Sequence, residues 1–576
     1  MQLWPGLADP VTLTHKHVTV NRSELRSILV LAVLCGFLFF FGLANFGLLG
    51  ADEPRYAQIG REMLERGDWV TPRLHGEVWL EKPVLYYWFE MVSYKLFGVT
   101  DWAARLPAAL LGAFLVAAIY VFIRRFRPGA EMEAAIITAS SVAIFAFARG
   151  VSTDMPLAVF FSIAMLGWWA AIESGRRRWL LVFYGSMALA ALAKGPVAVF
   201  LAALIIAVFV AFTRDLKLIL RTLWIPGIAL FLLLALPWYV LVQMRNPQFF
   251  SEFILSHNLA RFSTDVFRHT RPFWFFIPVL LLGLLPWTTF GVAGAIRAFR
   301  TWKAQRDRYT LFLFLWAVLP VIFFSLSQSK LPGYILPAIP AWTLLAADYL
   351  QARVNEQKRI PIVLVIFHGI ASALMMATVA FLPHFMLDRE VRLTVPTVSV
   401  TLTAAGLAFL FVAGLSFWRG TRLLRFATLV PLALCVAYVL RIAAPAIDAT
   451  QSARPVARSV TSVSMPVAVY RVSRSLEYGL AFYRNQRVAN YELGQIPREE
   501  HFLIAKQNQD KELAATLNEW KNAQSAANPS EESNPCKEEI VHALIPAGGF
   551  ALQGVRYYKV HSASFTRCQA RENGIP

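Results

Sequence analysis

The stretch ILVLAVLCGFLFFFGLANFGLLGADEPRY, residues 28–56, joins a long apolar run to a cluster of charged residues. The run from Ile28 to Leu49 has the length, about 20 residues, that a helix needs to cross the hydrocarbon core of a membrane. No small-residue cleavage site follows it cleanly, so we interpret it as the first spanning helix rather than a signal peptide. Asp52 and Glu53 are therefore expected at the membrane surface.

The residues after Glu53 predict a helix that lies along the membrane. Tyr56, Ile59, Gly60 and Met63 recur at helical spacing, while Arg55, Arg61, Glu62 and Glu65 take the other face. A second helix is predicted from Pro83 to near Gly98, with the aromatic residues of a membrane interface. The loop of residues 50–100 should thus form a folded shelf that carries carboxylates and a lysine.

The composition is that of an integral membrane protein. Of 576 residues, 57% are hydrophobic and only 16% are charged. The formal charge of +19 comes from short basic clusters between apolar runs, so membrane topology explains it better than nucleic acid binding does. Four cysteines show no metal-ligand spacing, and Cys536 and Cys568 in the polar tail are either a disulfide or free thiols.

Further apolar segments predict about thirteen transmembrane helices in all. After the first, they cover residues 104–124, 133–150, 154–173, 178–194, 195–213, 223–244, 273–297, 309–326, 332–350, 359–382, 397–418 and 424–444. Alternate loops are rich in arginine and lysine, for example Arg221, Arg359 and Arg425, which is typical of the cytoplasmic side.

This alternation predicts the division of the chain. We expect a cytoplasmic N-terminus at 1–27, a transmembrane domain at 28–446 with its first periplasmic loop at 50–100, and a periplasmic α/β domain at 447–576. Strands are predicted at 467–472, 488–491, 502–505 and 555–560, and a helix at 511–521.

The polar residues gather at the outer ends of the predicted helices, which indicates a site at the outer membrane surface. Each has an ordinary alternative: Asp52 and Asp154 can cap helices, Lys194 can belong to a turn, Arg261 can contact lipid headgroups, and His257 can be a surface histidine. These alternatives do not predict that so many lie on one face. Cations beside carboxylates within reach of lipid suit a substrate with a phosphate at the head of an apolar tail.

Several motifs resemble the bacterial membrane glycosyltransferases of the aminoarabinose transferase group, relatives of the protein O-mannosyltransferases. The motifs are Asp52-Glu53-Pro54-Arg55-Tyr56, Arg61-Glu62-Met63-Leu64, Gly67-Asp68-Trp69, Glu81-Lys82-Pro83, Asp154-Met155-Pro156, Lys194-Gly195 and Lys330-Leu331-Pro332-Gly333-Tyr334, in order over about residues 28–350. The resemblance implies a C-type glycosyltransferase fold in the bacterial inner membrane and an undecaprenyl-phosphate sugar donor used on the periplasmic face. For aminoarabinose members it also implies lipid A as acceptor and polymyxin resistance.

The resemblance also implies roles for individual residues. Asp52 and Asp154 are the expected catalytic acids. The donor phosphate would be held by Arg55, Lys82, Arg261, Lys330 and Tyr334, and the sugar or acceptor by Glu53, Glu81, Lys194 and Trp79. No cofactor is expected to be required, but Zn²⁺ or Mg²⁺ near Glu81, with His257, is a further expectation. The expected protein is a monomer that binds membrane lipids, the lipid-linked sugar and a lipid acceptor, with no nucleic acid partner.

Two departures from the group leave the transferred sugar open. Trp79 stands where aminoarabinose transferases tend to carry a tyrosine, and Thr153-Asp154-Met155-Pro156 stands where they often have Leu-Asp-Pro. A protein O-glycosyltransferase with the same donor is therefore an alternative. A transporter of lipid-linked sugars is a more distant one, because the predicted helices carry few polar residues and no internal repeat is visible.

Overall fold

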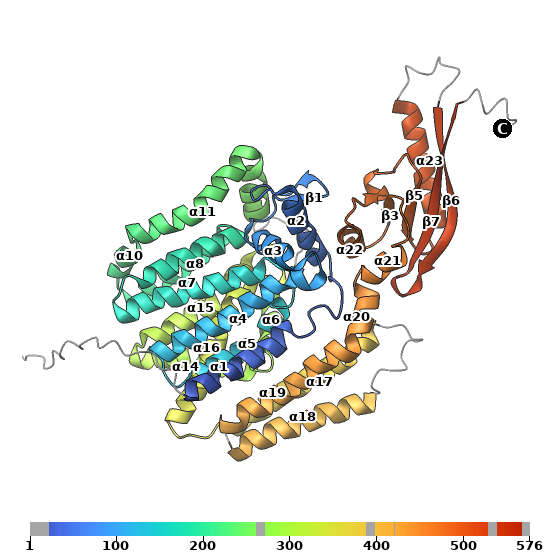
Figure 1. Ribbon diagram of the computed structural model, residues 1–576. Helices are drawn as coiled ribbons and strands as arrows, with labels where there is room; N and C mark the ends of the chain where they lie inside the picture. Colours follow the sequence, from blue (N-terminus) through green and yellow to red (C-terminus); the bar gives the residue numbers. More distant parts are fainter. Residues whose placement is uncertain (1–21, 261–270, 387–397, 420, 528–537, 567–576) are drawn as a thin grey trace, which may run out of the picture.

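The long apolar runs form helices in the computed structural model, which describes residues 22–260, 271–386, 398–419, 421–527 and 538–566. Figure 1 shows these helices packed side by side in a bundle, with a C-terminal sheet beyond one end. The bundle contains α1 (Arg22–Cys35), α4 (Asp101–Phe126), α5 (Glu131–Ser140), α6 (Val142–Phe147), α7 (Asp154–Ser174), α8 (Trp179–Lys194), α9 (Val197–Thr213), α10 (Lys217–Thr222), α11 (Ile225–Arg245), α13 (Phe276–Gly283), α14 (Thr288–Gln305), α15 (Arg308–Leu326), α16 (Ile339–Asn355), α17 (Ile362–Met386), α18 (Val398–Arg419), α19 (Thr421–Tyr438) and α20 (Ala444–Gln451). Short π-helical segments are η1 (Gly36–Phe40), η2 (Phe250–Ala260) and η6 (Val439–Ala443), and 3₁₀ turns are η3 (Phe273–Phe275) and η4 (Pro332–Ala338).

The chain is a multi-pass membrane protein. Within the described residues, seven helices are long and apolar enough to cross a membrane, and a bent pair makes an eighth if it is counted as one span. Other apolar segments form shorter helices, such as α8 and α9 with 16 and 17 residues. The predicted count of thirteen transmembrane helices is therefore not confirmed, although every predicted segment contains helix.

The first apolar run was predicted to form one helix from Ile28 to Leu49, but the helix ends before Leu49. The helix begins at Arg22 and ends at Phe40, and the chain turns at Gly42, where φ is +70°. The following loop is held by the buried guanidinium of Arg105, which donates to the carbonyl oxygens of Leu43, Phe46 and Gly47 over 2.8–2.9 Å. These bonds satisfy backbone groups that a continued helix would have satisfied itself.

Other predicted spans are interrupted. Segment 273–297 divides into Phe273–Gly283 and Thr288–Gln305, which meet at an angle of 114°. Segment 133–150 breaks at Ser141, and segment 332–350 begins as the 3₁₀ turn η4. Apolar residues stand on both sides of each break, so the apolar pattern predicts the length of the run and not the point where the helix changes direction.

The first loop contains the predicted helices, α2 (Asp52–Arg66) and α3 (Leu85–Phe97), and also a small hairpin of β1 (Arg73–Leu74) and β2 (Glu77–Val78). Tyr56, Ile59 and Met63 of α2 are buried, as their spacing predicts. Glu62, assigned to the polar face, is buried as well, because it accepts hydrogen bonds from the backbone N–H groups of His75 and Gly76. The carboxylate thus fixes the turn of the hairpin.

The C-terminal part holds α21 (Arg454–Ser459), α22 (Arg474–Arg484), α23 (Asp510–Ala527), the 3₁₀ turns η7 (Tyr491–Leu493) and η9 (Ala551–Gln553), and a five-stranded sheet. The sheet order is β4-β3-β5-β7-β6, with strands β3 (Val467–Tyr470), β4 (Ala489–Asn490), β5 (His501–Lys506), β6 (Glu538–Phe550) and β7 (Val555–Thr566). β3 pairs in parallel with β4 and β5, and β7 is antiparallel to β5 and β6. The four predicted strands and the helix are present, but β6 and α22 were not predicted.

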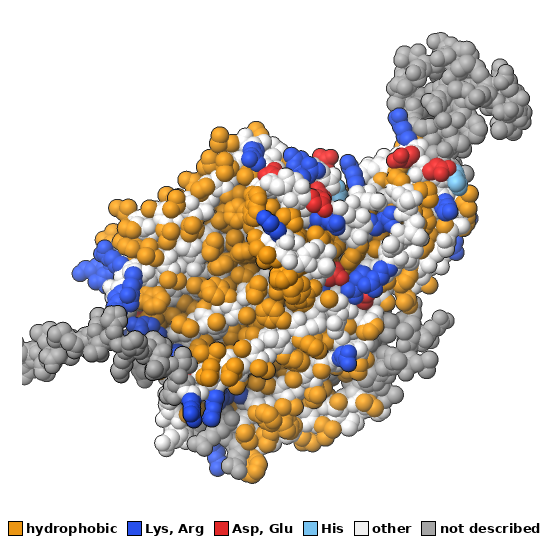
Figure 2. Space-filling model, in the orientation of Figure 1, with side chains coloured by type: hydrophobic (Ala, Val, Ile, Leu, Met, Phe, Trp, Pro, Cys, Tyr) orange, Lys and Arg blue, Asp and Glu red, His pale blue; other side chains and the backbone are white. Residues whose placement is uncertain are grey.

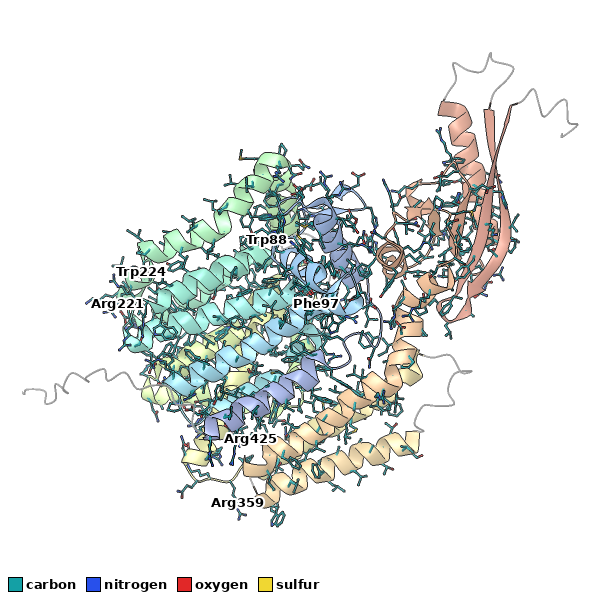
Figure 3. The ribbon with its side chains drawn as sticks, in the orientation of Figure 1. Trp88, Phe97, Arg221, Trp224, Arg359 and Arg425 are labelled. Atoms are coloured by element: carbon teal, nitrogen blue, oxygen red, sulfur yellow. The ribbon has the colours of Figure 1, made fainter. Side chains whose placement is uncertain are left out.

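Charge is distributed unequally between the two ends of the bundle. Figure 2 shows an apolar belt over the helices, with acidic and basic side chains intermixed at the end near the C-terminal sheet and mainly basic ones at the opposite end. Figure 3 places Arg221, Arg359 and Arg425 at that basic end and Trp88 and Phe97 at the other. These three arginines, which come from loops predicted to share one side of the membrane, therefore lie at the same end of the bundle.

Candidate active site

A cavity of about 1310 Å³ opens where the first loop meets the acidic end of the bundle. Its wall is formed by the start of α2, the loop before α3, the α6–α7 connection, the end of α8, η2 and the α15–η4 connection. Many predicted site residues line it: Asp52, Glu53, Arg55, Glu81, Lys82, Asp154, Lys194, His257 and Tyr334. The predicted convergence of these residues on one cleft is thus present, whereas their individual roles stay predictions.

Asp52 and Arg55 form one charged pair in the wall. Arg55 Nη2 donates to Asp52 Oδ1 over 2.5 Å, and the Asp52 side chain, which lines the cavity, is 61% exposed. The ordinary alternative, that Asp52 caps its helix, does not fit, because the N-cap residue is Ala51. Burial alone would lower the pKa of Arg55, but the acidic groups of Tyr56, Asp52 and Glu81 raise it by more, so the guanidinium stays charged.

The rings around Arg55 hold its guanidinium in place. Its carbon Cζ lies 5.1 Å from the ring centres of both Tyr56 and Trp79, and 5.9 Å from that of Tyr478. Trp79 contacts Arg55 in this way but is not part of the cavity wall. The tryptophan that replaces the group's usual tyrosine is thus placed to orient a cation through its ring face rather than to donate from a hydroxyl.

Asp154, Lys194 and Tyr334 form a second cluster. Lys194 Nζ bonds to Asp154 Oδ1 and lies 4.7 Å from the centre of the Tyr334 ring. A Cβ atom on Gly333 would lie 2.6 Å from Asp154 Oδ2, so only glycine lets η4 approach the carboxylate this closely. Asp154 and Lys194 therefore form one ion pair in the cavity wall, a contact that neither a helix cap nor a turn predicts.

Both carboxylate oxygens of Glu53 accept hydrogen bonds from other parts of the protein. Its Oε2 accepts hydrogen bonds from Leu49 N over 2.7 Å and from Arg105 Nη2 over 2.6 Å, and its Oε1 accepts one from Val151 N over 3.0 Å. These contacts favour a positioning role over the predicted contact with sugar or acceptor. Arg105 was not predicted as part of the site, although an arginine inside an apolar helix is a signal of a buried polar contact.

The C-terminal part also reaches the cavity. Arg474, the first residue of α22, lines it, and Tyr478 on the same helix contacts Arg55. α22 is fastened to the segments on either side of the first loop, because Tyr483 Oη accepts from Leu48 N over 2.8 Å and donates to Asp101 Oδ1 over 2.6 Å. No motif in the tail indicated these residues; only the fold brings them to the site.

One wall of the cavity is apolar. Phe200 of α9, Phe253 of η2, and Phe323 and Phe324 of α15 line it close to the charged groups. Phe200 is 52% exposed on the outer surface of the helices, so this wall continues to the lipid side of the bundle. The cavity can therefore take a ligand that is anionic at one end and apolar along its length.

Another predicted residue, Lys330, lies outside the cavity wall. Lys330 is buried beneath the cavity rather than in its wall, where it donates to the carbonyl oxygen of Ser327, and burial lowers its pKa. It can support the turn that presents Tyr334 but does not face the ligand space. Arg261, like Cys536 and Cys568, falls outside the described residues.

Few of the described side chains in the cavity could act as ligands for a metal ion. Glu81 and His257 both line the cavity, but the described part of the chain contains no group of three histidine, cysteine, aspartate or glutamate side chains able to hold a metal. The expected metal ion near Glu81 and the expectation that transfer needs no cofactor both stay predictions.

Comparison with known proteins shows what the sequence and the fold are similar to. Residues 81–240 match the family of dolichyl-phosphate-mannose-protein mannosyltransferases. Undecaprenyl phosphate-α-4-amino-4-deoxy-L-arabinose arabinosyl transferase from Serratia proteamaculans is 33% identical over 334 residues, which cover 56% of this chain and 59% of the relative. The second such transferase from Pseudomonas fluorescens is 30% identical over 354 residues, 60% of each chain.

The fold is that of ArnT from Cupriavidus metallidurans, whose crystal structure with undecaprenyl phosphate matches with a TM-score of 0.71 at 22% identity. The match covers 92% of this chain and 97% of that one. The resemblance to the aminoarabinose transferase group is thus confirmed. In sequence, the chain spans about three fifths of the length of the curated relatives it matches.

Proposed function

We propose that this protein is an inverting glycosyltransferase of the bacterial inner membrane. It moves an aminoarabinose-like sugar from undecaprenyl phosphate to lipid A or another cell-envelope glycolipid, on the periplasmic face. The observation that carries the proposal is the single cavity in which Arg55, Lys82 and Lys194 meet Asp52, Glu81 and Asp154 beside an apolar wall. The similarity to named arabinosyl transferases supports the same donor class.

The donor would bind by its phosphate. Arg55 and Lys82 supply charge to neutralise it, and Arg55 offers a planar fork suited to phosphate oxygens. A phosphate bound to Arg55 competes with the 2.5 Å pair to Asp52, so donor binding frees the Asp52 carboxylate. The same cations then stabilise the charge that develops on the leaving undecaprenyl phosphate.

The acceptor decides the role of Asp52. A hydroxyl acceptor needs a base, and the exposed Asp52 carboxylate can take its proton. A lipid A phosphate has a second pKa of about 6 and is already a nucleophile at neutral pH, so Asp52 would then orient the sugar. In both cases one displacement at the anomeric carbon forms the new glycosidic bond, releases undecaprenyl phosphate and inverts the configuration.

A sugar amine would explain the surplus of acids. Glu81 and Asp154 line the cavity with Asp52, and an ammonium gains from nearby carboxylates in a poorly hydrated space. In the proposed complex, the carboxylates therefore bind the sugar amine, and the arginine and lysine side chains bind the phosphate.

The purified protein should transfer labelled aminoarabinose from undecaprenyl phosphate to lipid A in detergent. Asp52→Asn and Lys82→Ala should each abolish this transfer without loss of folded protein. Glu65→Gln is a matched control, because it lies on the same helix as Asp52 but outside the cavity wall. Full activity in both Asp52→Asn and Lys82→Ala would refute the proposal.

A protein acceptor is the second candidate, because residues 81–240 match the protein mannosyltransferase family. Mass spectrometry of lipid A and of periplasmic proteins, from cells with and without this chain, separates the two acceptors. Translocation of the lipid-linked sugar with no covalent product would instead indicate a transporter.

A further inference from the structure

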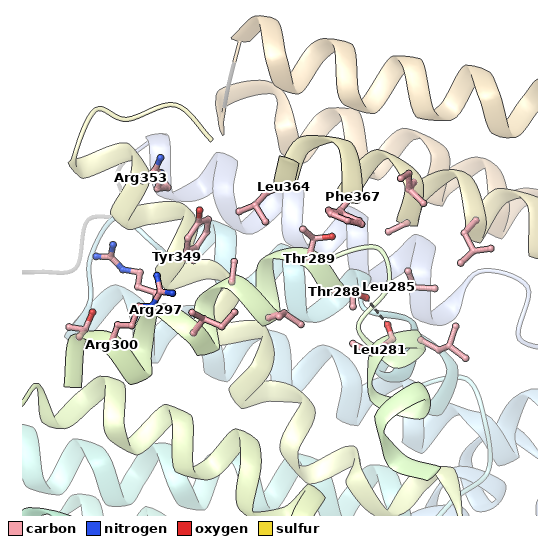
Figure 4. Close-up of a pocket in the computed structure, with 18 residues that line it drawn as sticks. Leu281, Leu285, Thr288, Thr289, Arg297, Arg300, Tyr349, Arg353, Leu364 and Phe367 are labelled. Carbon is pink, nitrogen blue, oxygen red and sulfur yellow. Dashed lines mark hydrogen bonds between the residues drawn. The ribbon is translucent and has the colours of Figure 1, made fainter. Parts of the chain in front are cut away.

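A second cavity, of about 920 Å³, lies between α13, α14, α16 and α17 and shares no lining residue with the candidate active site. Figure 4 shows it as a groove with Arg297, Arg300 and Arg353 at one end and Leu281, Leu285 and Thr288 at the other. Nothing in the proposed transfer uses this groove.

The groove is as long as one membrane leaflet is thick. From Thr288 to Arg300, α14 rises about 18 Å, while half of the hydrocarbon core measures about 15 Å. Between these ends the walls are apolar, with Val292 and Ile296 on α14 and Phe367 and Ile370 on α17. These side chains are partly exposed in the structure, so the groove is open to the lipid side. It therefore suits an acyl chain that lies parallel to the helices.

The charged end has an excess of arginine. Arg297 donates to Glu356 over 2.9 Å, and Arg353 lies 4.0 Å from the same carboxylate, so one acid faces both cations. The Nε atom of Arg353 is buried and has no hydrogen-bond partner among the described residues. Arg300 is exposed at the rim of the groove. An anion here would complete the hydrogen bonding of Arg353 and balance the charge.

The arginine end lies away from the candidate active site. Arg353 Nη2 donates to the carbonyl oxygen of Arg359 over 2.6 Å, and Figure 3 places Arg359 at the end of the bundle opposite Trp88 of the first loop. The loop charges predict that this end is cytoplasmic. A donor whose phosphate binds at Arg55 and Lys82 would not bring its charged group to this end.

We propose that the groove binds an anionic glycerophospholipid of the cytoplasmic leaflet. One acyl chain lies along α14 and α17, and the headgroup phosphate contacts Arg300 and Arg353. Basic pockets between transmembrane helices on the cytoplasmic side are suited to anionic headgroups. A zwitterionic lipid would fill the same apolar length but gain less from the excess positive charge.

The test is a titration of the delipidated full-length protein with phosphatidylglycerol and with phosphatidylcholine, followed by native mass spectrometry. Phosphatidylglycerol should bind more tightly than phosphatidylcholine. Arg300→Gln should lower the affinity for phosphatidylglycerol about fivefold, which is the effect of removing one basic residue near an anionic lipid surface. Val292→Trp should fill the groove and abolish binding of both lipids there. Lys303→Gln is the control, because it lies on α14 outside the groove and should change neither affinity.

Equal affinity for the two lipids, or unchanged phosphatidylglycerol binding in Arg300→Gln, would overturn the proposal. Displacement of phosphatidylglycerol from the groove by undecaprenyl phosphate at equal concentration would also overturn it, by assigning the groove to the donor. Arg300 is at the surface, so its variant keeps the test valid even if Val292→Trp fails to fold.

Discussion

Arg105 Nη2 lies 2.6 Å from Oε2 of Glu53, and this buried ion pair joins α4 to the first helix of the loop. The remaining hydrogen bonds of the two side chains go to backbone groups on both sides: Arg105 binds carbonyls of the loop after η1, and Glu53 accepts from Val151 before α7. One pair therefore links four segments: α4, α2, the loop after η1 and the connection before α7. Asp52, the next residue to Glu53, is held in place by the same contacts.

Loss of this pair should destabilise the protein strongly. Glu53→Gln keeps the shape but leaves Arg105 buried without a counter-charge, and removal of one partner of a buried pair costs about 3–5 kcal/mol. Thermal unfolding in detergent measures the loss. Glu65→Gln breaks the exposed pair with Arg61 and should cost less than about 1 kcal/mol. Similar melting temperatures for Glu53→Gln and Glu65→Gln would contradict the structural role of Glu53.

Lys194→Met should impair transfer and leave folding intact. The lysine lies in the cavity wall beside Asp154 and Tyr334, so its loss removes one charge from the space proposed for the phosphate. We expect kcat/KM to fall about 100-fold, the effect of losing one group that stabilises a developing negative charge. Lys217→Met, on α10 and outside the cavity wall, is the control. A kcat/KM equal to that of Lys217→Met would exclude Lys194 from the reaction.

Much of the helical architecture could be predicted, because each run of apolar residues near 20 in length must form helix in a membrane. The same reasoning could not locate the breaks. The end of the first helix at Phe40 depends on Arg105, more than sixty residues away, which binds the carbonyls of the loop that follows. Contacts at this separation leave no periodic pattern in the sequence.

The site was predictable to the extent that its residues are polar and lie at helix ends. Asp52, Lys82, Asp154 and Tyr334 were found in this way and share one cavity. Arg474 was missed because it begins an ordinary amphipathic helix in the tail and enters the site only through the docking of α22 on α2.

Arg474→Gln should test whether the C-terminal part takes part in acceptor binding. The side chain lines the cavity from α22 and can pair with an acceptor phosphate. We expect KM for lipid A to rise about tenfold with kcat little changed, because a charge-assisted hydrogen bond is lost in both the bound and transition states. Arg471→Gln, whose side chain pairs with Glu512 instead, is the control. An unchanged KM in Arg474→Gln would exclude a contact between Arg474 and the acceptor.

Glu90 of α3 is fully buried, and among the described residues neither of its carboxyl oxygens has a hydrogen-bond partner. A Cβ atom on Gly60 would lie 2.7 Å from its Oε2, so α2 and α3 meet closely at this carboxyl group. Burial raises the pKa of Glu90 well above its ordinary value of 4.5, because removal from water disfavours the charged carboxylate.

The raised pKa of Glu90 should make stability fall as pH rises. Above pH 4.5 the unfolded chain loses this proton and the folded chain keeps it, until the raised pKa is passed. The group's contribution to the free energy of unfolding is thus complete below pH 4.5 and declines by about 1.4 kcal/mol per pH unit above it. Glu90→Gln keeps the shape of the side chain but removes the group that titrates. The stability of this variant relative to the wild type should therefore increase between pH 5 and pH 8, and thermal unfolding at each pH measures it. Glu77→Gln, with a side chain that is 78% exposed, should follow the wild-type profile. If Glu90→Gln also followed it, the carboxyl group would have to ionise in the folded protein as easily as in the unfolded chain.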